Sequence, residues 1–157
     1  MNRPGAGAVL SIGSNVGDRL AHLRLAVEVL QPHAVSPVYE TAPVGGVAQG
    51  DFLNAVLLCP LTAEQAWALA QDAERRAGRQ RDVRWGPRTL DVDVVDAPPP
   101  VPDGLVVPHP HAHERAFVLA PWLDADPGAV LPGHGRVADL LGRLDRTGVR
   151  RVDGTLA

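Results

Sequence analysis

Lysine is absent from this sequence, and all fifteen basic residues are arginine. A Walker A phosphate-binding loop needs its lysine, and a Schiff-base enzyme needs a lysine amine, so both mechanisms are excluded. Every fixed positive charge is therefore a planar guanidinium group, which suits bidentate contacts with phosphate.

Cysteine is nearly absent too, because Cys59 is the only one. A single cysteine excludes an internal disulfide and a multi-cysteine zinc site. Its apolar setting, VLLCP, is typical of a core thiol. No apolar run approaches the ~18 residues of a membrane span, and the first residues lack the apolar region and cleavage site of an export signal. We therefore expect a cytoplasmic protein that does not enter a membrane.

The net charge and the length further limit the binding partners and the number of domains. A formal net charge of -3 gives no general attraction for nucleic acid or acidic membranes, so anion binding has to be local. The 157 residues, 45% of them apolar, predict one domain over 1–157 rather than two.

Hydrophobic periodicity predicts the order strand, helix, strand, strand, helix, strand. The strands are expected at 8–15, 33–41, 51–59 and 89–95, with 33–41 the weakest because Pro37 cannot donate to a ladder. Asp18 is the expected cap of the first helix, and Thr62 with Gln65 forms the capping box of the second, which Gly78 stops. This order predicts a ferredoxin-like antiparallel sheet.

Two further helices are expected after the stiff connector APPPVPDG. One lies in ERAFVLAPWL, with a stop near Pro121, and a short amphipathic one lies in VADLLGRL. They would pack on the sheet and complete an α+β fold of the α/β/α sandwich type.

The stretch RWGPRTLDVDVVD, residues 84–96, contains the most informative pair of acids. Residues two apart on a strand share a face, so Asp91 and Asp93 lie together with Cα atoms roughly 6.6 Å apart. Such a pair can hold Mg²⁺ for phosphate chemistry, or it can be the solvated face of a half-buried strand. Four arginines immediately before the strand favour the first interpretation, and these are Arg79, Arg81, Arg84 and Arg88.

RWGPRTLDVD, with FLNAV upstream and VPHPHAHERAF downstream, closely resembles the hydroxymethyl-dihydropterin pyrophosphokinases of folate biosynthesis. The resemblance runs from SIGSN at residue 11 to about Pro132. It implies that a pyrophosphoryl group passes from ATP to the hydroxymethyl group of a dihydropterin, with release of AMP. It also implies two Mg²⁺ ions and a monomer.

The resemblance assigns roles to named residues. The metal ligands would be Asp91 and Asp93, and Arg79 and Arg88 would join them in catalysis from a mobile loop. The ATP-binding residues would be Gln71, Glu74, Arg79, Arg84, Arg88, His109 and Arg115. The pterin-binding residues would be Thr41, Pro43, Val44, Phe52, Asn54, Trp85 and Phe117, with the two phenylalanine rings enclosing the pterin.

Several alternatives stay open. From pattern alone Phe52 and Phe117 are more often core residues, and the alternation of His109, His111 and His113 also fits zinc ligands. A non-catalytic RNA-binding module uses a similar sheet, but the chain has six aromatic residues and two acids where phosphate would lie. A two-metal phosphodiesterase would give no reason for Phe52, Asn54 and Phe117 together.

The chain also departs from the family pattern at several positions, among them Ala42, which stands where a proline is common. Asp96 and the proline run 98–100 predict a short or frayed end to the strand. Gly104 falls where some members carry an arginine near the triphosphate, so that contact is in question.

Overall fold

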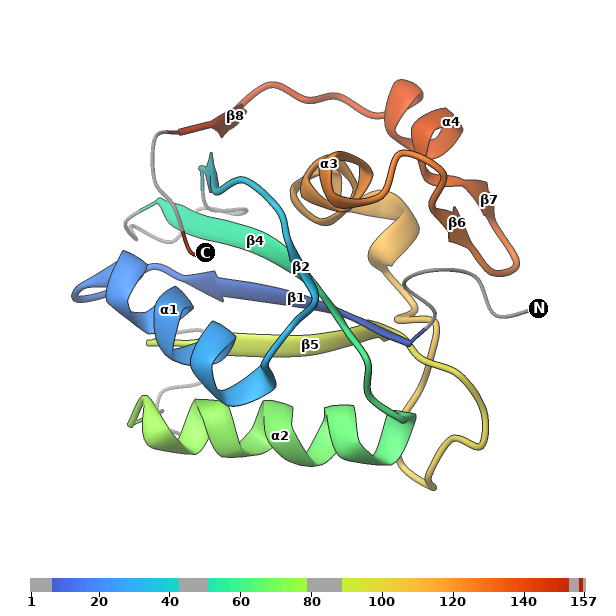
Figure 1. Cartoon of the computed structure of the whole chain (residues 1–157). Helices are drawn as coiled ribbons and strands as arrows, with labels where there is room; N and C mark the ends of the chain where they lie inside the picture. Colours follow the sequence, from blue (N-terminus) through green and yellow to red (C-terminus); the bar gives the residue numbers. More distant parts are fainter. Residues whose placement is uncertain (1–6, 43–50, 79–88, 153–155, 157) are drawn as a thin grey trace.

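The structure of the chain, a computed structural model, describes residues 7–42, 51–78, 89–152 and 156 (Figure 1). Its main sheet has the strand order β5-β1-β4-β3-β8, and β2 also pairs with β4. All of these pairings are antiparallel. The strands are β1 (Ala8–Ser14), β2 (Ala34–Val35), β3 (Tyr39–Thr41), β4 (Phe52–Cys59), β5 (Asp91–Asp96) and β8 (Val149–Arg151).

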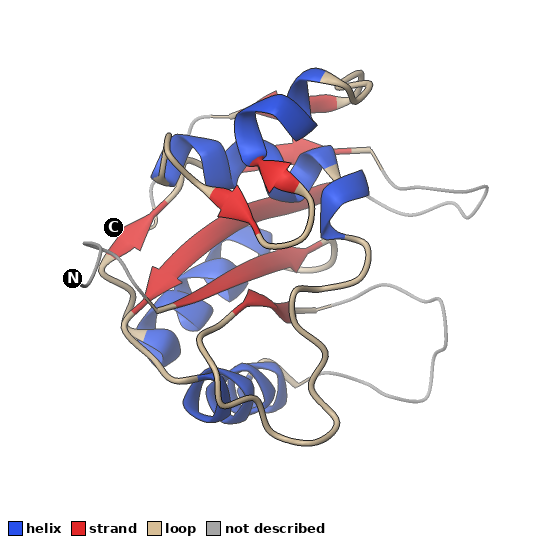
Figure 2. Cartoon of the chain, turned by 90° about the vertical axis from the view of Figure 1, so that its right-hand side faces the viewer, coloured by secondary structure: helices blue, strands red, loops and turns tan. Residues whose placement is uncertain are grey.

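Helices cover both faces of this sheet, as the α/β/α prediction requires (Figures 1 and 2). One face carries α1 (Arg19–Leu30) and α2 (Ala63–Arg76). The other carries α3 (Ala116–Ala125), α4 (Val137–Gly142) and the short helix η1 (Ala112–Glu114). A small hairpin, β6 (Val130–Leu131) with β7 (Gly135–Arg136), lies between α3 and α4 in the chain. Among the described helices, none has the length and apolar character to span a membrane.

The helix boundaries follow local side-chain chemistry. The Asp18 carboxylate accepts the Ala21 N–H at 3.1 Å, which satisfies one of the first free donors of α1. Thr62 and Gln65 exchange bonds of 3.0 and 3.1 Å at the start of α2, so the predicted capping box is confirmed. Gly78, at φ 73°, follows the cap of α2 and confirms the predicted stop.

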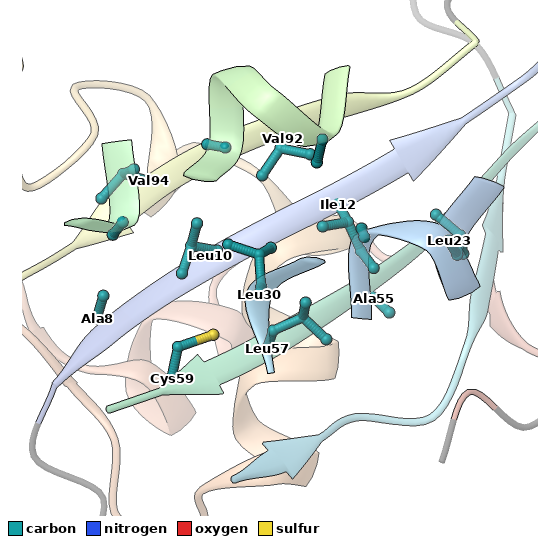
Figure 3. Packing of buried hydrophobic residues seen from close by; sticks show 14 of the residues in the cluster. Ala8, Leu10, Ile12, Leu23, Leu30, Ala55, Leu57, Cys59, Val92 and Val94 are labelled. Carbon is teal, nitrogen blue, oxygen red and sulfur yellow. The ribbon is translucent and has the colours of Figure 1, made fainter. Parts of the chain in front are cut away.

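Strand alternation divides the interior into two cores. Between the sheet and α1 and α2, alternate residues of β1, β4 and β5 point toward the helices (Figure 3). Val56 and Leu58 of β4 face the other way and pack with α3 and α4. Cys59 lies fully buried in the first core, and burial raises the pKa of its thiol to about 12, so it is a structural residue.

Three of the boundary predictions were wrong. The expected strand 33–41 is broken around Pro37 into β2 and β3. The helix containing Pro121 does not stop there but continues to Ala125, because Leu119, Ala120 and Trp122 are buried in the second core and hold the turn despite the missing N–H. The end of β5 is not frayed either: β5 reaches Asp96, and a register shift opposite Val9 and Leu10 accommodates one extra residue, Val95.

Packing explains the extra residue at Val95 and the glycine at residue 104. Val95 is almost fully buried, and its carbonyl accepts the His109 N–H at 2.7 Å. Gly104 has φ 94°, and a Cβ at this position would lie 3.1 Å from Cη2 of Trp67. A side chain at residue 104 would therefore be strained in the backbone and crowded by the Trp67 ring.

The Asp96 carboxyl is expected to destabilise the fold at neutral pH. Burial raises its pKa, so the folded state binds its proton more tightly than the unfolded state does. The unfolding free energy then falls as the pH rises from about 3.9, the unfolded value, through the folded pKa. Asp96→Asn should raise the unfolding free energy at pH 7, measured by urea denaturation, and the gain should shrink toward pH 4.

The exposed Asp103 provides the matched control. Asp103→Asn should leave stability within about 0.5 kcal/mol of the parent at both pH values. A lower stability of Asp96→Asn at pH 7 would contradict the burial argument.

Candidate active site

The pairing register places the two acids and the predicted pterin amide on one face of the sheet. Asp91 of β5 and Asn54 of β4 are both paired with Gly13 of β1, so the three form one row. Ser11 is paired with Asp93, which therefore lies in the next row of the same face. With strands about 4.8 Å apart, Asp91 and Asn54 are separated by roughly 10 Å across Gly13.

Asn54 is held by a neighbour on β3. It is 4% exposed and Thr41 is 6% exposed, and the Asn54 amide donates to the Thr41 hydroxyl. Thr41 is itself paired with Phe52, which lies on the same face as Asn54. A buried amide needs such a partner, and the bond fixes the direction in which Asn54 presents its remaining polar atoms.

Gly13, which has no side chain, forms the floor between these groups. A Cβ at this position would lie 2.9 Å from Oδ1 of Asn54 and 3.7 Å from Cδ1 of Phe52. The absence of a side chain at Gly13 therefore lets both neighbours take their positions. The motif SIGSN contained this residue, but only the strand register shows that it lies between the acids and the amide.

His109 lies near the second acid. Burial lowers the pKa of its imidazole, the charges of Arg115 and His111 lower it further, and the nearby Asp93 carboxylate opposes them. Its backbone N–H donates to the carbonyl of Val95 on β5, which fixes the segment above that strand. The structure thus brings Asp93 and Arg115 each within electrostatic reach of His109.

Arg115 and Phe117 start the helix that covers this face. Arg115 is the N-cap of α3, and its guanidinium carbon lies 5.8 Å from the centre of the Phe117 ring. Phe117 and Phe52 are both only partly buried, unlike Trp122 of the same helix, which is 3% exposed. Phe117 also packs against the second core, so part of its surface is buried there and part is accessible.

Glu74 reaches the outer edge of β5. Its Oε2 accepts the backbone N–H of Val92 at 2.9 Å, and Val92 lies between the two acids. Gln71, with an exposed side chain, lies one turn earlier on the same side of α2. The end of α2 therefore brings Glu74 to the strand that carries the acid pair.

Six predicted site residues lie outside the described residues: Pro43, Val44, Arg79, Arg84, Trp85 and Arg88. The other predicted residues belong to the sheet face, to α2, to the segment that leads into α3, or, for Phe117, to the first turn of α3.

The alternative zinc interpretation of the histidines gains no support. His111 Nδ1 lies 3.3 Å from a Glu114 oxygen, and the His113 ring stacks on His134 with centroids 4.1 Å apart. Within residues 7–42, 51–78, 89–152 and 156, no group of three or more His, Cys, Asp or Glu residues is arranged to hold a metal ion.

The close approach at Gly13 leads to a stability prediction. Gly13→Ala should lower the unfolding free energy by about 1–3 kcal/mol, because the new Cβ overlaps the Asn54 amide and forces a shift in a packed region. Urea denaturation measures this loss. Gly142→Ala is the matched control, since nothing lies within 4 Å of a Cβ there, and an equal loss in both variants would contradict the steric argument.

Comparison with known proteins adds an independent line of information. A family model described as 7,8-dihydro-6-hydroxymethylpterin-pyrophosphokinase (HPPK) matches residues 9–127. The 2-amino-4-hydroxy-6-hydroxymethyldihydropteridine pyrophosphokinase of Mycobacterium tuberculosis is 48% identical, over 90% of this chain and 87% of that protein. The Bacillus subtilis enzyme of the same name is 44% identical, over 73% of this chain and 74% of its own. The chain therefore belongs to the 7,8-dihydro-6-hydroxymethylpterin-pyrophosphokinase family.

Proposed function

We propose that the sheet face formed by Asp91, Asp93, Gly13, Asn54 and Phe52 is where this enzyme performs its reaction. As a member of its family the chain transfers pyrophosphate from ATP to the hydroxymethyl group of 6-hydroxymethyl-7,8-dihydropterin, releasing AMP, in folate biosynthesis. The observation that carries the site assignment is the row Asp91, Gly13, Asn54, which has a carboxylate at one end, a buried amide at the other and no side chain between them.

The acid pair fits Mg²⁺. Asp91 and Asp93 offer hard carboxylate oxygens on one face of one strand, and the described residues add no third acid or histidine. Mg²⁺ prefers this ligand type and keeps several waters, taking its other ligands from substrate phosphates. We infer two ions, each held by this pair, because two ions are the common arrangement in phosphate chemistry.

The pterin end of the site is the Asn54 side. A pterin is flat with one hydrogen-bonding edge, so Asn54, Thr41 and the backbone of Pro43 and Val44 would read that edge. Phe52 rises from the floor and Phe117 comes from α3, so the two rings would stack on opposite faces of the pterin. Trp85 would complete the enclosure by family analogy.

The nucleotide end is the β5 side. Gln71 and Glu74 at the end of α2 would contact the nucleotide, while His109 and Arg115 would bind phosphate oxygens near Asp93. Burial lowers the pKa of His109, so it would act at neutral pH as an uncharged hydrogen-bonding group. Arg79, Arg84 and Arg88 would supply further guanidinium groups by family analogy.

The reaction follows from this arrangement. The pterin hydroxyl attacks the β-phosphorus of ATP and forms a new O–P bond, while its O–H bond breaks and the proton is released to solvent. The bond between the β-phosphorus and the α,β-bridging oxygen breaks, and AMP leaves with that oxygen. Bound Mg²⁺ would lower the pKa of the hydroxyl and neutralise phosphate charge. The residues around the floor hold the hydroxyl and the phosphorus in line, and the arginines stabilise the charge on the departing AMP.

We further propose that the enzyme works as a single-domain monomer in the cytoplasm, where ATP is available, and that nucleic acid is not a partner. The net charge of -3 and the two acids on the site face support the last point.

Asp91→Asn and Asp93→Asn test the metal assignment. Each should lower kcat about a thousand-fold, since the loss of one carboxylate removes several kcal/mol of stabilisation of the transition-state charge. The measurement is AMP formation from ATP and hydroxymethyl-dihydropterin over a range of Mg²⁺ concentrations.

Asp96→Asn on the same strand is the matched control and should retain the parent rate. Parent-like AMP formation by Asp91→Asn or by Asp93→Asn would contradict the metal assignment. ADP in place of AMP would contradict pyrophosphoryl transfer itself.

A further inference from the structure

A charged cluster lies on the face of β3 that is turned away from the proposed site. Arg19 of α1 donates from Nη1 to Glu40 Oε2 at 3.0 Å and to the Asp51 carbonyl at 2.8 Å. Arg150 of β8 donates to the other oxygen of Glu40. The Glu40 side chain is 17% exposed, and the Arg19 guanidinium beside it lowers the pKa of its carboxyl. Glu40 is therefore ionised at neutral pH and held from two sides.

The cluster joins the segments that carry the pterin-reading residues. Glu40 immediately precedes Thr41, the last residue of β3, and Asp51 immediately precedes Phe52, the first residue of β4. Thr41 and Phe52 are paired, so Arg19 binds the two strands at the point where they meet. Successive residues of a strand point to opposite faces, so Glu40 points away from the face that carries Thr41. The interactions of Glu40 with Arg19 and Arg150 therefore lie on the face opposite the proposed site.

The next arginine of β8 holds β3 from the opposite face. Arg151 is paired with Tyr39, and both Arg151 and the Tyr39 hydroxyl donate to Asp124 of α3. Arg150 and Arg151 therefore reach opposite faces of the sheet, one toward α1 and the other toward α3. The Ala42 N–H also donates to the Gly148 carbonyl at 3.3 Å, just before β8.

Side-chain clamps matter here because β3 is short. It has three residues, and so does β8, so few backbone bonds fix its position. A small shift of β3 would move Thr41, and with it the Asn54 amide that donates to the Thr41 hydroxyl. The acids of β5 and the Glu74 contact lie at the other edge of the sheet, separated from β3 by β1 and β4.

We infer that Glu40, held by Arg19 and Arg150, is a positioning residue for the dihydropterin. It fixes β3 against β4 so that Thr41 and Asn54 meet the polar edge of the substrate. This inference rests on the proposed pterin site. Its signature is selective: a change in the KM for the pterin, with kcat and the KM for ATP unchanged.

Steady-state kinetics of three variants test the inference. Glu40→Ala should raise the pterin KM about tenfold, with kcat and the ATP KM within about twofold of the parent. Glu40→Gln, which keeps the shape and an acceptor oxygen but not the charge, should restore part of the loss. Arg150→Ala should raise the pterin KM several-fold, because it removes one of the two arginines that hold Glu40. The Arg150 side chain is 64% exposed, so this variant should stay folded even if Glu40→Ala does not.

Asp72→Ala is the matched control, because Asp72 is also a carboxylate held by two arginines, Arg75 and Arg76, but within α2 alone. Its pterin KM should equal that of the parent. An unchanged pterin KM in Glu40→Ala and Arg150→Ala, or equal increases in the KM values of both substrates, overturns the inference.

Asn54→Ala separates this inference from the site assignment on which it rests. If Asn54→Ala raises the pterin KM while the Glu40 and Arg150 variants do not, only the positioning role fails. If Asn54→Ala leaves the pterin KM unchanged, the pterin-site assignment fails, and the positioning role fails with it.

Discussion

The pairing of β1 with both β4 and β5 is the constraint on which the site depends. Each strand alternates between the two faces, so a slip of one residue would turn Asp91 and Asp93 into the core under α2 and send Val92 and Val94 to the site face. Burial of apolar side chains such as Leu10, Ile12 and Leu57 opposes that slip (Figure 3). The core that stabilises the fold therefore also determines the face of the sheet on which Asp91 and Asp93 lie.

The opposite face of the same strands accepts polar residues near the site and apolar ones farther along. On β4, Phe52 and Asn54 lie at the site end, and Val56 and Leu58 continue into the second core beneath α3. The helix α3 thus covers the part of the face that carries Val56 and Leu58. Gly13 adds no side chain between Asp91 and Asn54, and the Asn54 amide, which this arrangement buries, donates to the Thr41 hydroxyl.

Local chemistry made much of the fold predictable. Asp18, Thr62 with Gln65, and Gly78 mark helix ends through bonds and backbone angles that involve only neighbours in sequence, and the structure has them there. Predictions failed where distant packing overrides local preference, as at Pro121 and at the end of β5. The two arginines of β8 were not predicted to have a structural role, because their partners Glu40 and Asp124 are distant in the chain. The roles of individual site residues stay predictions.

The sequence by itself determined the family, the strand and helix order, and the common face of Asp91 and Asp93, because motifs and two-residue periodicity are local properties. Only the tertiary structure decided that Gly13 separates those acids from Asn54, that Glu74 closes the edge of β5, and that Glu40 joins α1 to β8. These relations depend on strand order and register, which arise when segments far apart in the chain bury their apolar faces together.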